Sequence, residues 1–159
     1  MEPATLTSEL GLDRPPRLLN DGKWWLLAAI GLAAGPVLWF IAGISPAASV
    51  PQGIWQWCAV IGWQPITEEL LFRGLLQGQL LRLRWGKRTW LGLSGANLTT
   101  SLVFTALHFL YHTPPWAAAV VLPSLAFGWL RERHHSTWSP LITHVLFNLA
   151  FFLTAAIPA

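Results

Sequence analysis

Two adjacent carboxylates inside an apolar stretch are the first candidates for chemistry. Glu68 and Glu69 stand between apolar residues, and Arg73 follows closely. On a helix Glu69 and Arg73, four apart, share a face and can pair. Glu68 is turned away from that face by about 100°. Glu68 is therefore the carboxylate without a local partner, unless both groups simply sit in a wet headgroup region.

Two further apolar segments each carry a polar residue one helical turn from another side chain. Phe104 precedes His108 by four residues, and His144 precedes Asn148 by four. Each pair lies on one face of its helix. Polar groups in membrane segments normally face the interior of a bundle or a watery cavity. We therefore expect these side chains and the glutamates to converge.

A carboxylate, two imidazoles and a carboxamide around one point can hydrolyse an amide. A glutamate in dry surroundings can act as general base on a water molecule. One imidazole can hold the same water, and the second imidazole and the carboxamide can donate to the oxyanion. The sequence thus predicts a catalytic set that needs no serine or cysteine nucleophile: Glu68, His108, His144 and Asn148.

The elements that must position this set are read from composition and apolar runs. Hydrophobic residues make up 53% of the 159 residues, charged residues only 11%, and there are 11 tryptophans. A soluble domain would carry about a quarter charged residues, whereas tryptophan favours membrane boundaries. The expected fold is all-α, a polytopic bundle of about five transmembrane helices. The predicted segments are 24–43, 53–84, 90–111, 116–130 and 138–157.

Basic residues flank these segments in alternate loops. They cluster at 14–23, 82–88 and 131–133, while the loops 44–52 and 111–115 carry no charge. This pattern predicts a cytoplasmic amino terminus. Residues 1–23 are predicted to form a mobile polar cytoplasmic arm, and 24–159 a single transmembrane domain. We expect the first helix to be retained, the alternative being cleavage near residues 47–49.

The third segment poses a geometric problem for the proposed site. At ~1.5 Å per residue from the basic flanks, His108 would lie about 27 Å from the inner edge and His144 about 9 Å. Straight, upright helices would keep the two imidazoles apart. Either the helices tilt, or the third helix begins near Leu98 with residues 92–97 as a turn.

Three motifs follow one another along the chain: Glu68–Arg73, Phe104–His108 and His144–Asn148. In this order they resemble the motifs of the CAAX-prenyl-protease and bacteriocin-processing family, the glutamic-type intramembrane proteases. The resemblance runs from Pro65 to about residue 152. It implies that Glu68 and His108 activate water, and that His144 and Asn148 form the oxyanion hole. The supporting residues it implies are Glu69, Arg73 and Phe104.

The short chain is similar to small bacterial members that remove carboxy-terminal sorting tails. We therefore expect an integral protein of a bacterial inner membrane that acts on a membrane-anchored protein or peptide. Neither a cofactor nor a metal nor nucleic acid is expected, and the motifs do not report the substrate or the oligomeric state.

Two other interpretations stay open at this point. Glu68, His108 and His144 match the ligand set of a catalytic zinc, although the paired-histidine helix motif of zinc peptidases is absent. Intramembrane Glu, His and Arg also build non-enzymatic sites, such as those of a membrane immunity or binding protein. Five segments without an internal repeat make a transporter a poor fit.

Overall fold

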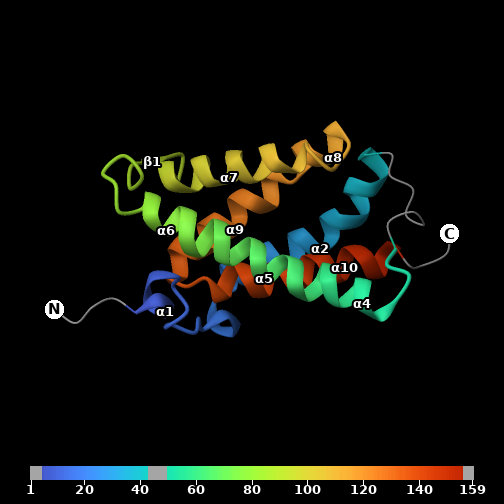
Figure 1. Ribbon diagram of the computed structural model, residues 1–159, viewed down its shortest axis with the longest axis horizontal. Helices are drawn as coiled ribbons and strands as arrows, with labels where there is room; N and C mark the ends of the chain where they lie inside the picture. The colour runs from blue at the N-terminus through green and yellow to red at the C-terminus, as the bar shows by residue number, and fades with distance from the viewer. Residues whose placement is uncertain (1–4, 43–49, 156–159) are drawn as a thin grey trace.

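Most of the described chain is helical in the computed structural model, which describes residues 5–42 and 50–155 (Figure 1). The helical elements are α1 (Leu6–Glu9), η1 (Leu18–Asn20), α2 (Gly22–Ala42), α4 (Ile54–Trp57), η2 (Cys58–Trp63), α5 (Gln64–Glu69), η3 (Leu70–Leu76), α6 (Gln77–Leu80), α7 (Gly95–His108), α8 (Pro114–Ala119), α9 (Val121–His134) and α10 (Trp138–Ala155). The strands β1 (Thr89–Trp90) and β2 (Leu93–Ser94) pair antiparallel. The helical part of the predicted fold class is therefore confirmed, with a small hairpin added.

The helix that carries the two glutamates is wound unevenly. From α4 to α6 the chain is helical throughout, and the wider π-helical turns η2 and η3 lie on either side of α5. Pro65, near the start of α5, has no N–H to donate to the carbonyl of Ile61, and its ring crowds that carbonyl. A widened turn before Pro65 accommodates both effects. Such π turns occur frequently at functional sites.

The third predicted segment begins later than the sequence suggested. Residues 89–94 form the β1–β2 hairpin, because Leu91 and Gly92 both have positive φ (50° and 83°), as a tight two-residue turn requires. Ser94 then caps α7 by accepting a hydrogen bond from the Asn97 N–H at 2.9 Å. A helix over 90–111 is therefore wrong at its start. The alternative turn at 92–97 and helix start near Leu98 are closer, but α7 starts at Gly95.

The fourth predicted segment is two helices. Pro123 cannot donate to the carbonyl of Ala119, and α8 ends at that residue. The chain restarts as α9, which runs beyond the predicted end at residue 130 to His134. His135 ends α9 in a left-handed conformation with φ 51°. The first and fifth predicted segments, 24–43 and 138–157, agree closely with the bounds of α2 and α10.

Helix α9 packs against both α7 and α10, and α2 packs against α10. Close approach of α7 and α9 depends on Gly128, because a side-chain carbon there would overlap the Asn97 amide. Asn97 Nδ2 donates to the carbonyl of Leu125 at 3.0 Å, which ties the same two helices together. The helix pair that flanks the glutamates is thus held at a fixed spacing.

The described part of the amino-terminal arm lies against the bundle (Figure 1). The Thr137 N–H donates to the Gly11 carbonyl at 2.9 Å, and Trp138 Nε1 donates to the Leu12 carbonyl at 2.9 Å. Leu18 is buried in a cluster with Trp24 and Leu130. The arm was expected to be mobile, but residues 5–21 are docked by these bonds. The alternative cleavage site at residues 47–49 lies outside the described residues.

In the described part of the chain, no helix has both the length and the apolar character needed to cross a membrane. The number of spans expected from the sequence stays a prediction.

Candidate active site

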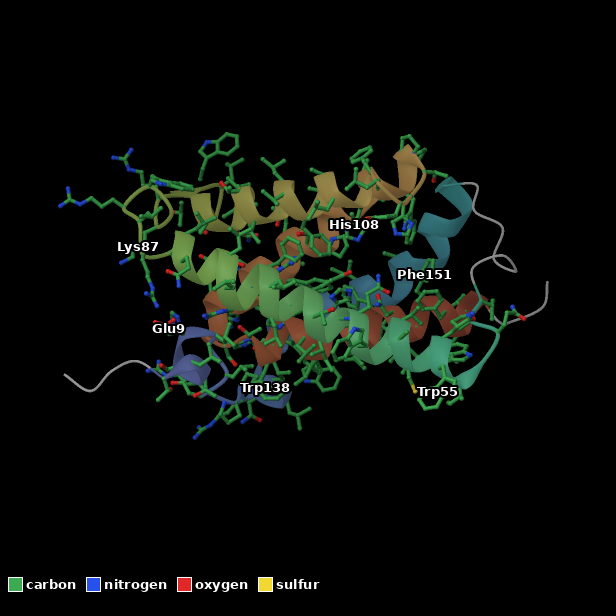
Figure 2. The ribbon with its side chains drawn as sticks, viewed as in Figure 1. Glu9, Trp55, Lys87, His108, Trp138 and Phe151 are labelled. Atoms are coloured by element: carbon green, nitrogen blue, oxygen red, sulfur yellow. The ribbon has the colours of Figure 1, made fainter. Side chains whose placement is uncertain are left out.

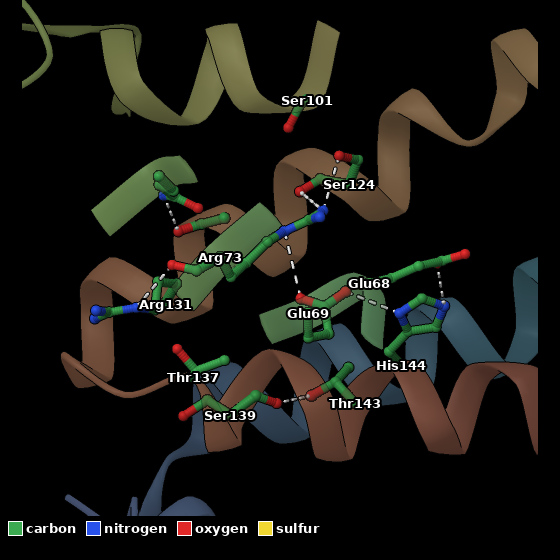
Figure 3. A network of polar contacts seen from close by, with 12 residues as sticks. Glu68, Glu69, Arg73, Ser101, Ser124, Arg131, Thr137, Ser139, Thr143 and His144 are labelled. Carbon is green, nitrogen blue, oxygen red and sulfur yellow. Dashed lines mark hydrogen bonds and ion pairs between the residues drawn. The ribbon is translucent and has the colours of Figure 1, made fainter. Parts of the chain in front are cut away.

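Glu69 is the centre of a buried polar cluster (Figure 3). Its Oε1 lies 2.8 Å from His144 Nδ1, and its Oε2 lies 3.4 Å from Arg73 Nε. The side chains of Glu69 and Arg73 are completely buried. The pairing of Glu69 with Arg73 predicted from helical spacing is confirmed, and the contact of Glu69 with His144 from α10 is part of the convergence expected between the glutamates and the histidines.

Arg73 is positioned by one hydrogen-bonded nitrogen and by two aromatic rings. Its Nη2 donates to Ser124 Oγ at 2.8 Å and to the Ser124 carbonyl at 3.1 Å. The guanidinium carbon lies 4.7 Å from the centre of the Phe104 ring and 5.7 Å from that of Phe127. Aromatic faces attract a desolvated cation. The positive charge that balances Glu69 is therefore fixed from α7 and α9.

Glu68 is oriented differently from its neighbour. Its Oε2 lies 3.8 Å from His144 Nε2, and its side chain keeps 19% of its exposure, against 0% for Glu69. A separation of 3.8 Å is beyond direct hydrogen-bond range. The Glu68 carboxylate therefore faces the second nitrogen of the same imidazole without being occupied by it.

His144 lies between the two carboxylates (Figure 3). Its ring stacks on Phe127, with centroids 4.8 Å apart and planes at 26°. The Glu69 carboxylate faces Nδ1, so this nitrogen carries a proton and donates. The position and tilt of His144 are both set by side chains from other helices.

His108 is held mainly by its own helix. Its Nδ1 lies 2.8 Å from the Phe104 carbonyl, and its ring contacts the Phe104 ring at 4.4 Å and stacks on His112 at 5.6 Å. Among the hydrogen bonds, ion pairs and ring contacts of residues 5–42 and 50–155, none joins His108 to Glu68 or His144. The connection runs through Phe104, which the Arg73 guanidinium covers. The expected direct convergence is therefore seen for Glu68 and His144 but not for His108.

Asn148 lies one turn beyond His144 on α10. Its Nδ2 donates to the Val60 carbonyl of η2 at 2.8 Å. A carboxamide nitrogen has two N–H donors, and this bond uses one of them. Asn148 thus braces α10 against the widened turn before α5.

Two site-supporting residues, Gln77 and Ser124, were missed in the sequence. Gln77 is fully buried and donates to the Gly128 carbonyl at 3.0 Å and to Glu132 Oε1 at 2.7 Å. A signal was available, because Glu69, Arg73 and Gln77 repeat every four residues and so form one polar stripe. Ser124 carried only the weak signal of a hydroxyl in an apolar run.

A zinc site would require several ligands around one ion. Within the described residues, no three His, Cys, Asp or Glu side chains are grouped so that they could hold a metal. The zinc interpretation requires Glu68, His108 and His144 to surround one ion, and the arrangement of these residues gives it no support.

The chain is thus a helical protein in which a buried Glu–Arg–His cluster joins α5, η3 and α10. Comparison with protein families matches residues 50–150 to the family described as type II CAAX prenyl endopeptidase Rce1-like. The match covers more than half of the chain and includes all four predicted catalytic residues, so the chain belongs to this family, and the resemblance found in the sequence is confirmed. No curated protein and no solved structure matches the chain.

Proposed function

We propose that this member of an endopeptidase family hydrolyses a peptide bond of a membrane-anchored protein or peptide, using water activated by Glu68 and His108. The proposal depends on one observation: two carboxylates of α5 face the two nitrogens of His144. One carboxylate is buried and paired with Arg73, and the other keeps an accessible surface. A purely structural ion cluster has no need of the second, unsaturated carboxylate.

A membrane location is supported by the family and by the exposed side chains. Membership of this family favours a location in a membrane. Large apolar side chains are exposed along α7, including Leu102 at 64% and Leu107 at 45%. Trp63 and Leu71, on the helix that carries the glutamates, are 70% and 57% exposed. Apolar surface of this extent is typical of proteins that contact lipid or a partner.

The two imidazoles differ in a way that suggests different roles. A carbonyl oxygen can only accept, so His108 Nδ1 carries the proton, and a neutral His108 presents the Nε2 lone pair. His144 Nδ1 faces a carboxylate instead, and the Glu68 carboxylate lies beyond Nε2. An imidazolium at His144 would balance the charges of Glu68, Glu69 and Arg73. We assign His108 as acceptor for the water and His144 as donor to the oxyanion.

In the proposed reaction, Glu68 takes a proton from water while the water oxygen forms a bond to the scissile carbonyl carbon. The carbonyl oxygen becomes an oxyanion, to which His144 Nε2–H and the second N–H of Asn148 donate. The intermediate then collapses, the C–N bond breaks, and Glu68 returns its proton to the leaving amine. Atoms and charge balance without a covalent enzyme intermediate. Removal of a carboxy-terminal sorting tail is the substrate class we propose.

The Glu68→Gln variant tests the proposal. Full-length protein is co-expressed with membrane-anchored proteins that carry such tails, and their ends are measured by mass spectrometry. We expect parent protein to produce trimmed ends and Glu68→Gln to produce none. Glu9→Gln is the matched control. It makes the same exchange at a carboxylate of the amino-terminal arm, which pairs with Arg82 outside the site.

Two outcomes would contradict the proposal. Trimmed ends that are equally abundant with Glu68→Gln would show that host peptidases made them, which favours a non-enzymatic protein. Loss of trimming on addition of a strong chelator to purified enzyme, with recovery on adding zinc, would restore the zinc peptidase. Cleavage that survives the chelator excludes it.

A further inference from the structure

The β1–β2 hairpin presents two large apolar side chains at its tip. Trp90 is 70% exposed and Leu91 is 85% exposed. Leu91 also has a φ of 50°, a conformation that a leucine adopts at some cost and that glycine or asparagine would adopt more readily. An exposed leucine in a strained turn contributes nothing to the core. A contact outside the chain would account for it.

The loop that leads into this hairpin is strongly basic. Arg84, Lys87 and Arg88 are exposed, and between Glu69 and Glu132 the sequence contains no acidic residue. Within the described residues, none of these three cations has an ion-pair partner, whereas Arg82 pairs with Glu9 at 3.3 Å. Figure 2 shows Lys87 in this loop at the end of the molecule. Unpaired positive charge therefore lies in the loop directly before the apolar tip.

The base of the hairpin is fixed to the bundle. The Gly95 N–H donates to the Arg88 carbonyl at 2.9 Å, and the Ala96 N–H donates to the Gly86 carbonyl at 3.0 Å. Ser94 Oγ donates to Glu132 Oε1 of α9 at 2.5 Å. The tip is thus held in place by its base rather than by contacts of its own. A fixed base with an exposed apolar tip is suited to insertion into the headgroup region of a membrane.

We infer that the hairpin is an anchor that inserts Trp90 and Leu91 among anionic phospholipid headgroups, with Arg84, Lys87 and Arg88 binding their phosphates. Tryptophan is favoured at the headgroup boundary, and each cation near an anionic leaflet strengthens association. Charge complementarity commits the surface to anionic lipid, because lipid phosphates match the unpaired cations and the headgroup boundary accommodates the tryptophan that follows them. The inference rests on the membrane location proposed above and not on the peptidase chemistry.

Site-specific labelling of the full chain tests the insertion. Cys58 is the single cysteine, so Cys58→Ser gives a background in which Leu91→Cys takes one environment-sensitive fluorophore. The labelled protein is reconstituted in phosphatidylcholine vesicles with and without phosphatidylglycerol. We expect a blue shift and protection from iodide in the anionic vesicles. Leu6→Cys is the control, because Leu6 is 73% exposed and belongs to α1, which lies at the same end of the molecule (Figure 1) but carries the acidic Glu9.

Removing cations at two places tests whether lipid binding depends on the charges next to the hairpin or only on the net positive charge of the protein. The variant Arg84→Gln, Lys87→Gln, Arg88→Gln is compared with Arg14→Gln, Arg17→Gln, Lys23→Gln, which removes the same residue types from the arm. We expect the hairpin variant to need more phosphatidylglycerol for half-maximal protection, by about five-fold per cation. The arm variant should change little.

Equal iodide quenching at positions 91 and 6 in anionic vesicles would overturn the anchor, as would equal effects of the two charge variants. Neither result depends on cleavage. Extraction of the protein from membranes by alkaline carbonate would count against the intramembrane location, and loss of the Glu68 dependence would count against the chemistry.

Discussion

The two imidazoles of the site are held in opposite ways. His144 is fixed by residues far away in the sequence: Glu69 binds one ring nitrogen, Glu68 faces the other, and Phe127 covers the ring. His108 is fixed by residues of its own helix and the turn after it, namely the Phe104 carbonyl and the His112 ring. One half of the site is therefore built by tertiary contacts and the other by local ones.

This difference predicts where stability and activity separate. Contacts that bury charge across helices contribute to the free energy of folding, and their loss leaves a buried group without a partner. Local contacts on a half-exposed side chain set its orientation at little cost to the fold. We expect the His144 side to be sensitive in both stability and activity, and the His108 side in activity alone.

The largest effect should come from Arg73→Met. The substitution leaves Glu69 buried without its cation, and such losses cost about 3–5 kcal/mol. Denaturant unfolding in detergent measures the change. The control is Arg82→Met, which removes an exposed ion pair and should cost at most about 1 kcal/mol. Similar losses for the two variants would mean that the Glu69 pair does not stabilise the fold.

A smaller effect distinguishes the two imidazoles directly. In His144→Asn the amide nitrogen can replace Nδ1 and still donate to Glu69, whereas His144→Leu leaves the carboxylate without this donor, at a cost of about 1–3 kcal/mol. At position 108 we expect Asn and Leu to give similar stability. All four variants should lose cleavage, because each lacks Nε2. A stability difference at 108 as large as that at 144 would contradict the comparison.

The smallest effect concerns Asp21, which lies outside the site. Its ion pair should change the stability of the fold at low pH without changing cleavage. The hydrogen bond from Arg133 holds the pKa of the Asp21 carboxyl well below its usual range, with further contributions from His134 and the Lys23 N–H. A carboxyl with a lowered pKa stabilises the fold above its unfolded pKa of about 3.9, and the gain is lost as the pH falls below that value.

We therefore expect the melting temperature of the parent protein to fall between about pH 4 and pH 2 more steeply than that of Asp21→Asn. Cleavage at neutral pH should be the same for both. Parallel melting curves over this pH range would show that the contact of Asp21 with Arg133 and His134 contributes nothing to stability.

Much of the site could be predicted from the chain because helical periodicity is local. Glu69 with Arg73 and Phe104 with His108 meet as their four-residue spacing indicates. The apolar runs located α2 and α10 closely. Residues 90–94 were wrongly predicted to begin a helix, because a short apolar run with tryptophan and leucine can form a hairpin as well as a helix. The positive φ values at Leu91 and Gly92 show that this run forms a hairpin.

What the sequence determined by itself is which side chains share a helical face and which carboxylate lacks a local partner. The tertiary structure decided that both carboxylates meet the same imidazole, that His108 contacts its own helix, and that the arm docks on α10. The reason is physical: spacing along a helix follows from 3.6 residues per turn, whereas contacts between helices depend on how widened turns and close glycines let the helices approach.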